Sequence, residues 1–175
     1  MKATGNFAAV KDIDPTAVLS AETLAHIDRW IAKFPPDRKR SAVLQGLMAA
    51  QRQNGGWLSD ELIAAVAKVL GIPPVWAYEV ATFYSMFHLE PCGRNEVAIC
   101  TNISCWLNGG EDIVRHCEKK LGIAHGQSTA DGRVFLKVEE ECLAACAGAP
   151  MMVVDGHYHE KLTPAKVDAL LDGLE

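Results

Sequence analysis

Two pairs of cysteines constrain this chain more than any other feature. Cys100 and Cys105 form a C-x₄-C pair, and Cys142 and Cys146 form a C-x₃-C pair. A soft metal ion or an iron–sulfur cluster needs four thiolates that converge on one place. We therefore ask whether the rest of the sequence folds so that the two pairs meet.

The composition is that of a globular protein, and it narrows the class of partner. The 175 residues carry a net charge of −5, which argues against nucleic acid or an anionic membrane surface as the main partner. We find no signal-peptide pattern and no run of about 18 apolar residues, so we expect no direct membrane insertion. A cytoplasmic protein is expected, and in that compartment paired cysteines favour metal or redox chemistry over structural disulfides.

The first half of the chain has helical periodicity. Residues 1–19 show no clear pattern and are expected to form an irregular arm. Over residues 20–89, apolar residues recur at helical spacing in four stretches, the second over about 38–53, with proline or glycine between them. This predicts a four-helix bundle without a convergent set of titratable groups. Its aromatic residues are expected in the core: Trp30, Phe34, Trp57, Trp76, Phe83, Tyr84 and Phe87.

The pattern changes over residues 90–175. The expected elements are a strand over 96–100, a helix over 110–121, a strand over 133–138, strands over 151–154 and 157–159 joined by Asp155-Gly156, and a last helix capped by Thr163. The order βαβ then ββα predicts a thioredoxin-like domain, so the overall class is α/β, or α+β with the bundle included. Strands of a βαβ unit are parallel, and each cysteine pair follows one of them. Both pairs are therefore expected at the same edge of the sheet.

Spacing alone leaves three kinds of chemistry open. Structural zinc sites use C-x₂₋₄-C pairs, so zinc fits. A 2Fe–2S cluster also takes four thiolates, and C-x₄-C occurs in plant-type ferredoxins. Reactive or disulfide-forming cysteines are the third possibility, although C-x-x-C, the thioredoxin-type dithiol, is absent.

The wider sequence resembles a known family. The stretches ATFYSMFHLEPCGRN, CTNISCWLNGG and EECLAACAGAPMMVVDGHYHEKLTP are similar to the 24-kilodalton subunits of NADH:quinone oxidoreductase (respiratory complex I). The resemblance runs from about residue 20 to the C-terminus. It implies that Cys100, Cys105, Cys142 and Cys146 ligate a 2Fe–2S cluster, with the first pair on one iron and the second pair on the other.

The resemblance also implies partners and a role. The chain would be a non-catalytic electron-transfer subunit that exchanges single electrons with FMN, while FMN and NADH bind to a partner flavoprotein subunit. It would lie with further peripheral-arm subunits on the cytoplasmic side of the bacterial inner membrane. Alternatives are the equivalent small subunit of an NAD-dependent formate dehydrogenase or of a hydrogenase diaphorase, and, in another class, a zinc-stabilised interaction module.

Several other residues carry smaller expectations. Cys117 has the spacing of a core residue, and Cys92 is expected to pack between domains. His157 and His159 are interpreted as residues of an ordinary strand face and not as metal ligands. No catalytic residue is assigned. Hydrogen bonds to the cluster are expected from Thr101, Asn102 and Ser104 and from the backbone amides of both loops. An opposing charge is expected from Glu139-Glu140-Glu141, and the Ala149–Pro150 bond is a candidate cis bond.

Overall fold

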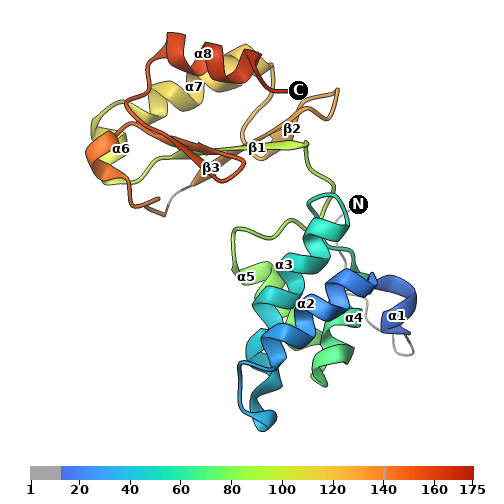
Figure 1. The fold of residues 1–175 in the computed structure, drawn as a ribbon. Coiled ribbons are helices and arrows are strands. Elements are labelled where there is room, and N and C mark those ends of the chain that lie inside the picture. The colour runs from blue at the N-terminus through green and yellow to red at the C-terminus, as the bar shows by residue number, and fades with distance from the viewer. Residues whose placement is uncertain (1–12, 140) are drawn as a thin grey trace. The chain divides into compact units, whose positions relative to one another are not determined.

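The computed structural model describes residues 13–139 and 141–175. The chain divides into two compact units, Met1–Pro91 and Cys92–Glu175, which we call the helical unit and the sheet unit. The mixed α/β class expected from the sequence is confirmed (Figure 1). The exact division into an arm, a bundle and a cluster-binding domain stays a prediction.

Helices build the whole described part of the first unit. They are α1 (Pro15–Val18), α2 (Ala21–Ile31), the 3₁₀-helix η2 (Pro36–Ala42), α3 (Val43–Gln53), α4 (Asp60–Leu70) and α5 (Pro74–Phe83). Side-chain oxygens cap three of them, because Asp14 accepts from the Thr16 amide, Ser20 from the Thr23 amide and Ser59 from the Leu62 amide. Apolar residues of α4 form the middle of the core, with Ile27 and Leu47 from the neighbouring helices.

Three expectations for the helical unit need correction. The irregular arm contains the short helix α1, although residues 1–12 lie outside the described residues. The second helix does not begin at Arg38, where the backbone is non-helical; a 3₁₀ stretch follows the two prolines and the α-helix starts at Val43. The prediction that the aromatic residues lie in the core was wrong in part. Trp76, Tyr84 and Phe83 are exposed, and Phe83 is 79% exposed.

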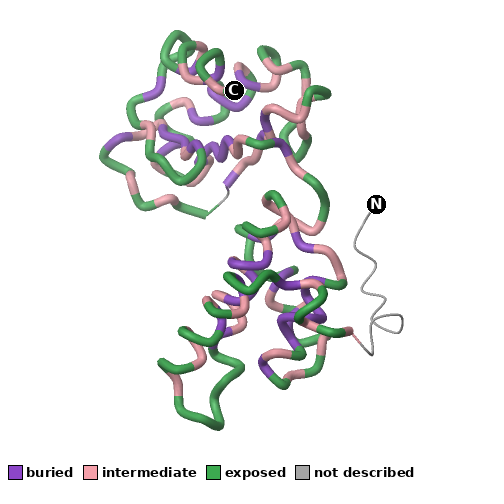
Figure 2. The backbone as a smooth tube through the Cα atoms, turned by 45° about the vertical axis from the view of Figure 1, so that its right-hand side comes forward, coloured by how far each residue is buried: buried purple, intermediate pink, exposed green. Residues whose placement is uncertain are grey.

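The sheet unit places two helices on a five-stranded sheet. Its elements are β1 (Asn95–Cys100), α6 (Ile103–Leu107), α7 (Gly110–Leu121), β2 (Gln127–Ser128), β3 (Val134–Glu139), the 3₁₀-helix η3 (Cys146–Gly148), β4 (Met152–Val154), β5 (His157–His159) and α8 (Pro164–Asp172). The strand order is β2-β3-β1-β4-β5. α7 and α8 lie together on one side of it, and their apolar residues share a core with the central strands (Figures 1 and 2).

The pairing of β1 with β3 is the feature that positions the site. These strands are parallel, in register from Asn95 opposite Val134 to Cys100 opposite Glu139, as the βαβ pattern predicts. β4 and β5 form the expected hairpin, with positive φ at both Asp155 and Gly156. The Ala149–Pro150 bond is cis. The short elements α6 and β2 were not expected from the sequence.

Candidate metal centre

Both cysteine pairs reach the same edge of the sheet, as expected. Cys100 is the last residue of β1 and Cys105 lies in α6, while Cys142 and Cys146 follow β3. The four side chains line one small hollow together with Asn102, Ser104, Ala145 and Met151. The parallel register of β1 and β3 brings this about, because both strands end at the same edge.

The first pair is buried in regular structure. Cys100 and Cys105 are almost fully buried, and their side chains hydrogen-bond to each other. Burial, with Cys100 as the second cause, raises the pKa of the Cys105 thiol to about 11. The first residue of α7, Gly110, packs against this loop so closely that an added Cβ would lie 2.9 Å from the Cys105 carbonyl oxygen and 3.1 Å from that of Cys100.

The second pair is exposed. The Sγ atoms of Cys142 and Cys146 are 3.3 Å apart, and the Ala144 amide donates to Cys142 Sγ at 3.3 Å. Ala144 takes a positive φ of 61°, a strained conformation for a residue with a Cβ, which aims its amide at the sulfur. Hydrogen bonds from the Cys142 thiol and the Ser104 hydroxyl lower the pKa of Cys146.

The expected sulfur donors are met only in part. Ser104 hydrogen-bonds to Cys146, and Asn102 lines the hollow. The prediction that Thr101 donates to sulfur was wrong, because both its amide and its hydroxyl donate to the Glu139 carbonyl, at 2.9 and 3.2 Å. The Ala144 amide is one of the loop amides that were expected to donate, and the backbone conformation of this residue decides which amide does so.

The acidic run before the second pair places less unpaired negative charge near the cysteines than its sequence indicates. Glu139 is buried and forms an ion pair with Lys137, which also approaches Glu96 at 3.6 Å. Glu140 lies outside the described residues. Glu141 is exposed, so of the described carboxylates in this run it is the one that faces water directly.

The remaining cysteines and the strand histidines lie apart from the hollow. Cys117 is fully buried in the core of the sheet unit, as expected, and burial raises the pKa of its thiol to about 12. Cys92 is half-buried, and burial raises the pKa of its thiol too. His157 and His159 lie on β5, outside the lining of the hollow.

The donor set suits either an iron–sulfur cluster or a single zinc ion. Each thiol is hydrogen-bonded to its own pair mate, and all four line the same hollow. Within residues 13–139 and 141–175, no three His, Cys, Asp or Glu side chains are gathered around one metal position. A 2Fe–2S cluster takes four thiolates, which is the number that these two pairs supply.

Comparison with known proteins decides between the alternatives that spacing left open. The family model described as thioredoxin-like [2Fe-2S] ferredoxin matches residues 27–175. The chain belongs to this family. Its cofactor is therefore a 2Fe–2S cluster and not zinc, and the lowered pKa of Cys146 does not mark a thiol oxidoreductase.

Two curated relatives carry names from one kind of enzyme. The chain is 49% identical over 144 residues to a subunit of NADH-quinone oxidoreductase from Rickettsia bellii (strain RML369-C), covering 82% of this chain and 86% of that protein. It is 43% identical over 154 residues to the mitochondrial "NADH dehydrogenase [ubiquinone] flavoprotein 2" of Dictyostelium discoideum, covering 88% of this chain and 62% of that protein. These names support an oxidoreductase role for this chain.

A solved structure gives the same fold in another setting. The NAD⁺-reducing [NiFe]-hydrogenase in the air-oxidized state aligns with 73% of this chain at a TM-score of 0.62 and 27% identity. The aligned part is 22% of that hydrogenase chain, so the likeness concerns one portion of a larger protein. It confirms the thioredoxin-like fold of this family in our chain.

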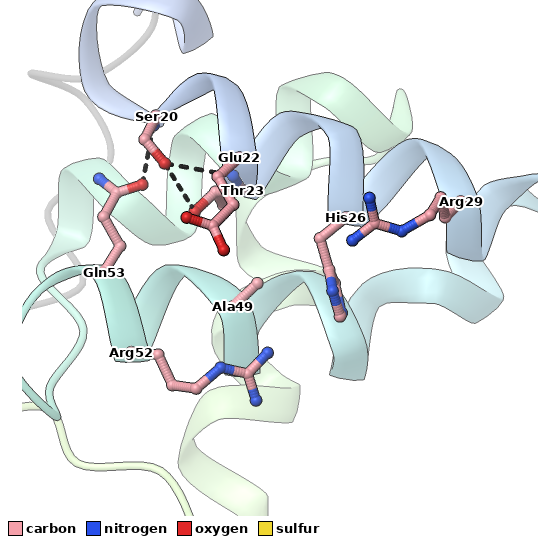
Figure 3. A pocket seen from close by; sticks show the side chains of 8 residues that line it. All are labelled: Ser20, Glu22, Thr23, His26, Arg29, Ala49, Arg52 and Gln53. Carbon is pink, nitrogen blue, oxygen red and sulfur yellow. Dashed lines mark hydrogen bonds between the residues drawn. The ribbon is translucent and has the colours of Figure 1, made fainter.

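The helical unit also holds a cavity that sequence reasoning missed. It has a volume of about 330 Å³ and lies between α2 and α3. Figure 3 shows the side chains that line it: Ser20, Glu22, Thr23, His26, Arg29, Ala49, Arg52 and Gln53. The packing of two helices brings titratable residues from distant parts of the sequence to one cavity, and the interpretation that this half holds no functional site stays a prediction.

Proposed function

We propose that the chain is the 2Fe–2S electron-transfer subunit of the NADH-oxidising part of an NADH-quinone oxidoreductase. The observation that carries the proposal is the hollow in which two thiol pairs meet at the ends of two parallel strands. The names of the curated relatives support this enzyme. The ligands in this proposal are Cys100, Cys105, Cys142 and Cys146.

In this role the chain has no catalytic residue of its own. The bound cluster supplies a site that gains and loses one electron. The Ala144 amide and the Ser104 hydroxyl donate to sulfur, which favours the reduced and more negative state. The ion pair between Glu139 and Lys137 removes much of the opposing field of the nearest carboxylate.

The partner in this proposal is a flavoprotein subunit that binds FMN and NADH. The chain itself would exchange electrons with that flavin and take a place in the peripheral arm, on the cytoplasmic side of the membrane. Within the described residues, no helix is long and apolar enough to span a bilayer.

A second assembly is favoured by one observation. The likeness to a portion of an NAD⁺-reducing hydrogenase supports a diaphorase subunit, which would use the same cluster chemistry with a different partner. Purification of the chain from its own cells under mild conditions separates the two. Quinone-reductase subunits in the same fraction support the first proposal, and hydrogenase subunits support the second.

The first test is an anaerobic purification with absorption, iron and sulfide measured on one sample. We expect a red-brown protein with about two irons and two sulfides per chain. Replacing Cys92 or Cys117 by Ala is the matched control, because neither lines the hollow and both variants should keep the colour. A protein whose colour depends on Cys92 and not on Cys142 would overturn the ligand assignment.

A further inference from the structure

Positive groups line the cavity of the helical unit. This cavity, between α2 and α3, has a volume of about 330 Å³, which is at the small end of the range for ligand pockets. Its lining includes two guanidinium groups, those of Arg29 on α2 and Arg52 on α3. Among the residues that the structure describes, neither guanidinium forms a hydrogen bond or an ion pair with another side chain or with the backbone.

The imidazole of His26 stands beside these groups with an unsatisfied atom. Its Nε2 atom is buried and has no hydrogen-bond partner within the described part of the chain. A buried polar atom in this state destabilises a folded protein, so it indicates a group that the atom is arranged to meet. His26 and Arg29 are three residues apart on α2 and share a face, and Figure 3 shows both at one end of the cavity.

The one carboxylate of the lining belongs to the opposite end. Glu22 is seven residues before Arg29, so their α-carbons are about 10 Å apart along α2. The Glu22 end is already paired, because the Ser20 amide donates to Gln53 Oε1 and the Thr23 amide donates to the Ser20 hydroxyl oxygen (Figure 3). Among the lining residues, the end with His26 and the arginines therefore has no counter-ion.

The packing of the two helices leaves this space open. Gln53 Nε2 donates to the Val18 carbonyl, so the end of α3 lies beside the start of α2 and the helices run antiparallel. The lining residues buried at their contact are small, namely Thr23 and Ala49. The two arginines are exposed, so a solute can reach their guanidinium groups from water.

The donors suit a phosphate group better than a carboxylate. A guanidinium presents paired N–H donors, and Nε2 of an imidazole can add one more from a third direction. A carboxylate has two oxygens in one plane, and a single guanidinium fork already binds both of them. A phosphate monoester has three acceptor oxygens in tetrahedral directions, so it can accept from Arg29, Arg52 and His26 together.

We propose that this cavity binds a phosphate group through His26, Arg29 and Arg52. The phosphate is either the free ion or a monoester of a small molecule, whose body would lie toward Ser20 and Gln53. Its charge would also offset the repulsion between two guanidiniums in one cavity. The inference goes beyond the proposed function, since the cavity lies within the helical unit and uses no ligand of the cluster. It also departs from the sequence expectation that this half holds no site.

Isothermal titration calorimetry of the cluster-loaded full chain with inorganic phosphate tests the proposal, at an ionic strength held constant with chloride. The variants are Arg29→Gln and Arg52→Gln. The matched control is Arg38→Gln, which loses the same charge at an exposed position of the same unit, outside the cavity. We expect the dissociation constant to rise at least about tenfold for each variant and less than about twofold for the control. Circular dichroism checks that each variant keeps its helices.

Two further solutes identify the ligand. Glycerol 3-phosphate that binds more tightly than inorganic phosphate assigns the site to a monoester, and equal or weaker binding assigns it to the free ion. Acetate that binds as tightly as phosphate would overturn the assignment to phosphate. Thermal unfolding in the same solutions is the second measurement, because a ligand of the folded chain raises the midpoint.

Two results would overturn the site itself. One is the same affinity for phosphate in both cavity variants as in the Arg38→Gln control. The other is the absence of both binding heat and a shift of the unfolding midpoint up to about 10 mM phosphate. The colour of the protein and its iron content play no part in these outcomes, so a failure here is distinct from a failure of the proposed function.

Discussion

The two cysteine pairs belong to contrasting structures. Cys100 and Cys105 are buried, lie on a strand and a helix, and are backed by the first turn of α7. Cys142 and Cys146 are exposed and lie in a loop that one strained residue, Ala144, helps to shape. The comparison indicates that packing holds the first pair in place, whereas the second pair is held by fewer surrounding atoms.

Substituting one proposed ligand from each pair should give the largest difference between the two pairs. In Cys100→Ser we expect the cluster to be lost. The serine oxygen reaches less far than sulfur, and in this buried site no water can take the empty ligand position. In Cys142→Ser we expect part of the cluster to remain with an altered spectrum, since the exposed loop can move toward the iron. Iron and sulfide analysis with electron paramagnetic resonance measures both. Equal loss in the two variants would contradict the comparison.

Adding a methyl group behind each pair should give the next largest difference. Gly110→Ala meets backbone atoms of Cys100 and Cys105, and overpacking of this kind costs about 1–3 kcal/mol. Gly148→Ala meets the Glu160 side chain, which is exposed and can turn away, so we expect a much smaller cost. Urea unfolding of the loaded proteins provides the measurement. A larger loss in Gly148→Ala would show that the second loop is the more rigid one.

Removing a sulfur donor should change the reduction potential by a smaller amount. Ser104→Ala deletes the hydroxyl hydrogen bond to Cys146, worth about 1 kcal/mol, or about 40 mV for one electron. The potential should fall, because the lost donor favoured the more negative reduced state. Ser104→Thr keeps a hydroxyl and is the control. A redox titration followed by electron paramagnetic resonance tests this, and a rise in potential would reverse the role assigned to Ser104.

The smallest effect is expected from the exposed carboxylate. Glu141→Gln should raise the potential by about 20 mV, which is the effect of one charge at roughly 8 Å in water. The same titration in about 1 M salt should remove the difference, because the charge is solvent-exposed and screened. A difference that survives high salt would mean that this loop is buried when the cluster is bound.

The order and pairing of the main strands could be predicted from the sequence better than the short elements and the side-chain contacts. Parallel strands before each cysteine pair followed from the βαβ pattern, and the structure brings the pairs together as expected. The α6 helix and the two-residue strand β2 are too short to have a periodicity. The sequence places Glu139 and Lys137 two residues apart on one strand, so their ion pair could be predicted. The burial of Glu139 could not, because it depends on how the unit packs.

The exposed aromatic residues show a different limit. Phe83 has the same helical spacing as residues that are buried, and periodicity alone does not tell which of them the fold leaves exposed. Trp106 in the short helix α6 is also exposed. His26 and Arg52 line one cavity of the helical unit because α2 packs on α3, and no local sequence pattern predicts that packing.

The parallel register of β1 and β3 has a further consequence, for the chain in its unfolded state. With the cluster bound as proposed, one inorganic group ties residue 105 to residue 142 and closes the loop of α7, β2 and β3 between them. A disulfide closing a loop of this length would remove unfolded-chain entropy worth about 4 kcal/mol. The cluster therefore acts as a crosslink, and its loss should leave the sheet unit folded less stably while the helical unit keeps its own stability.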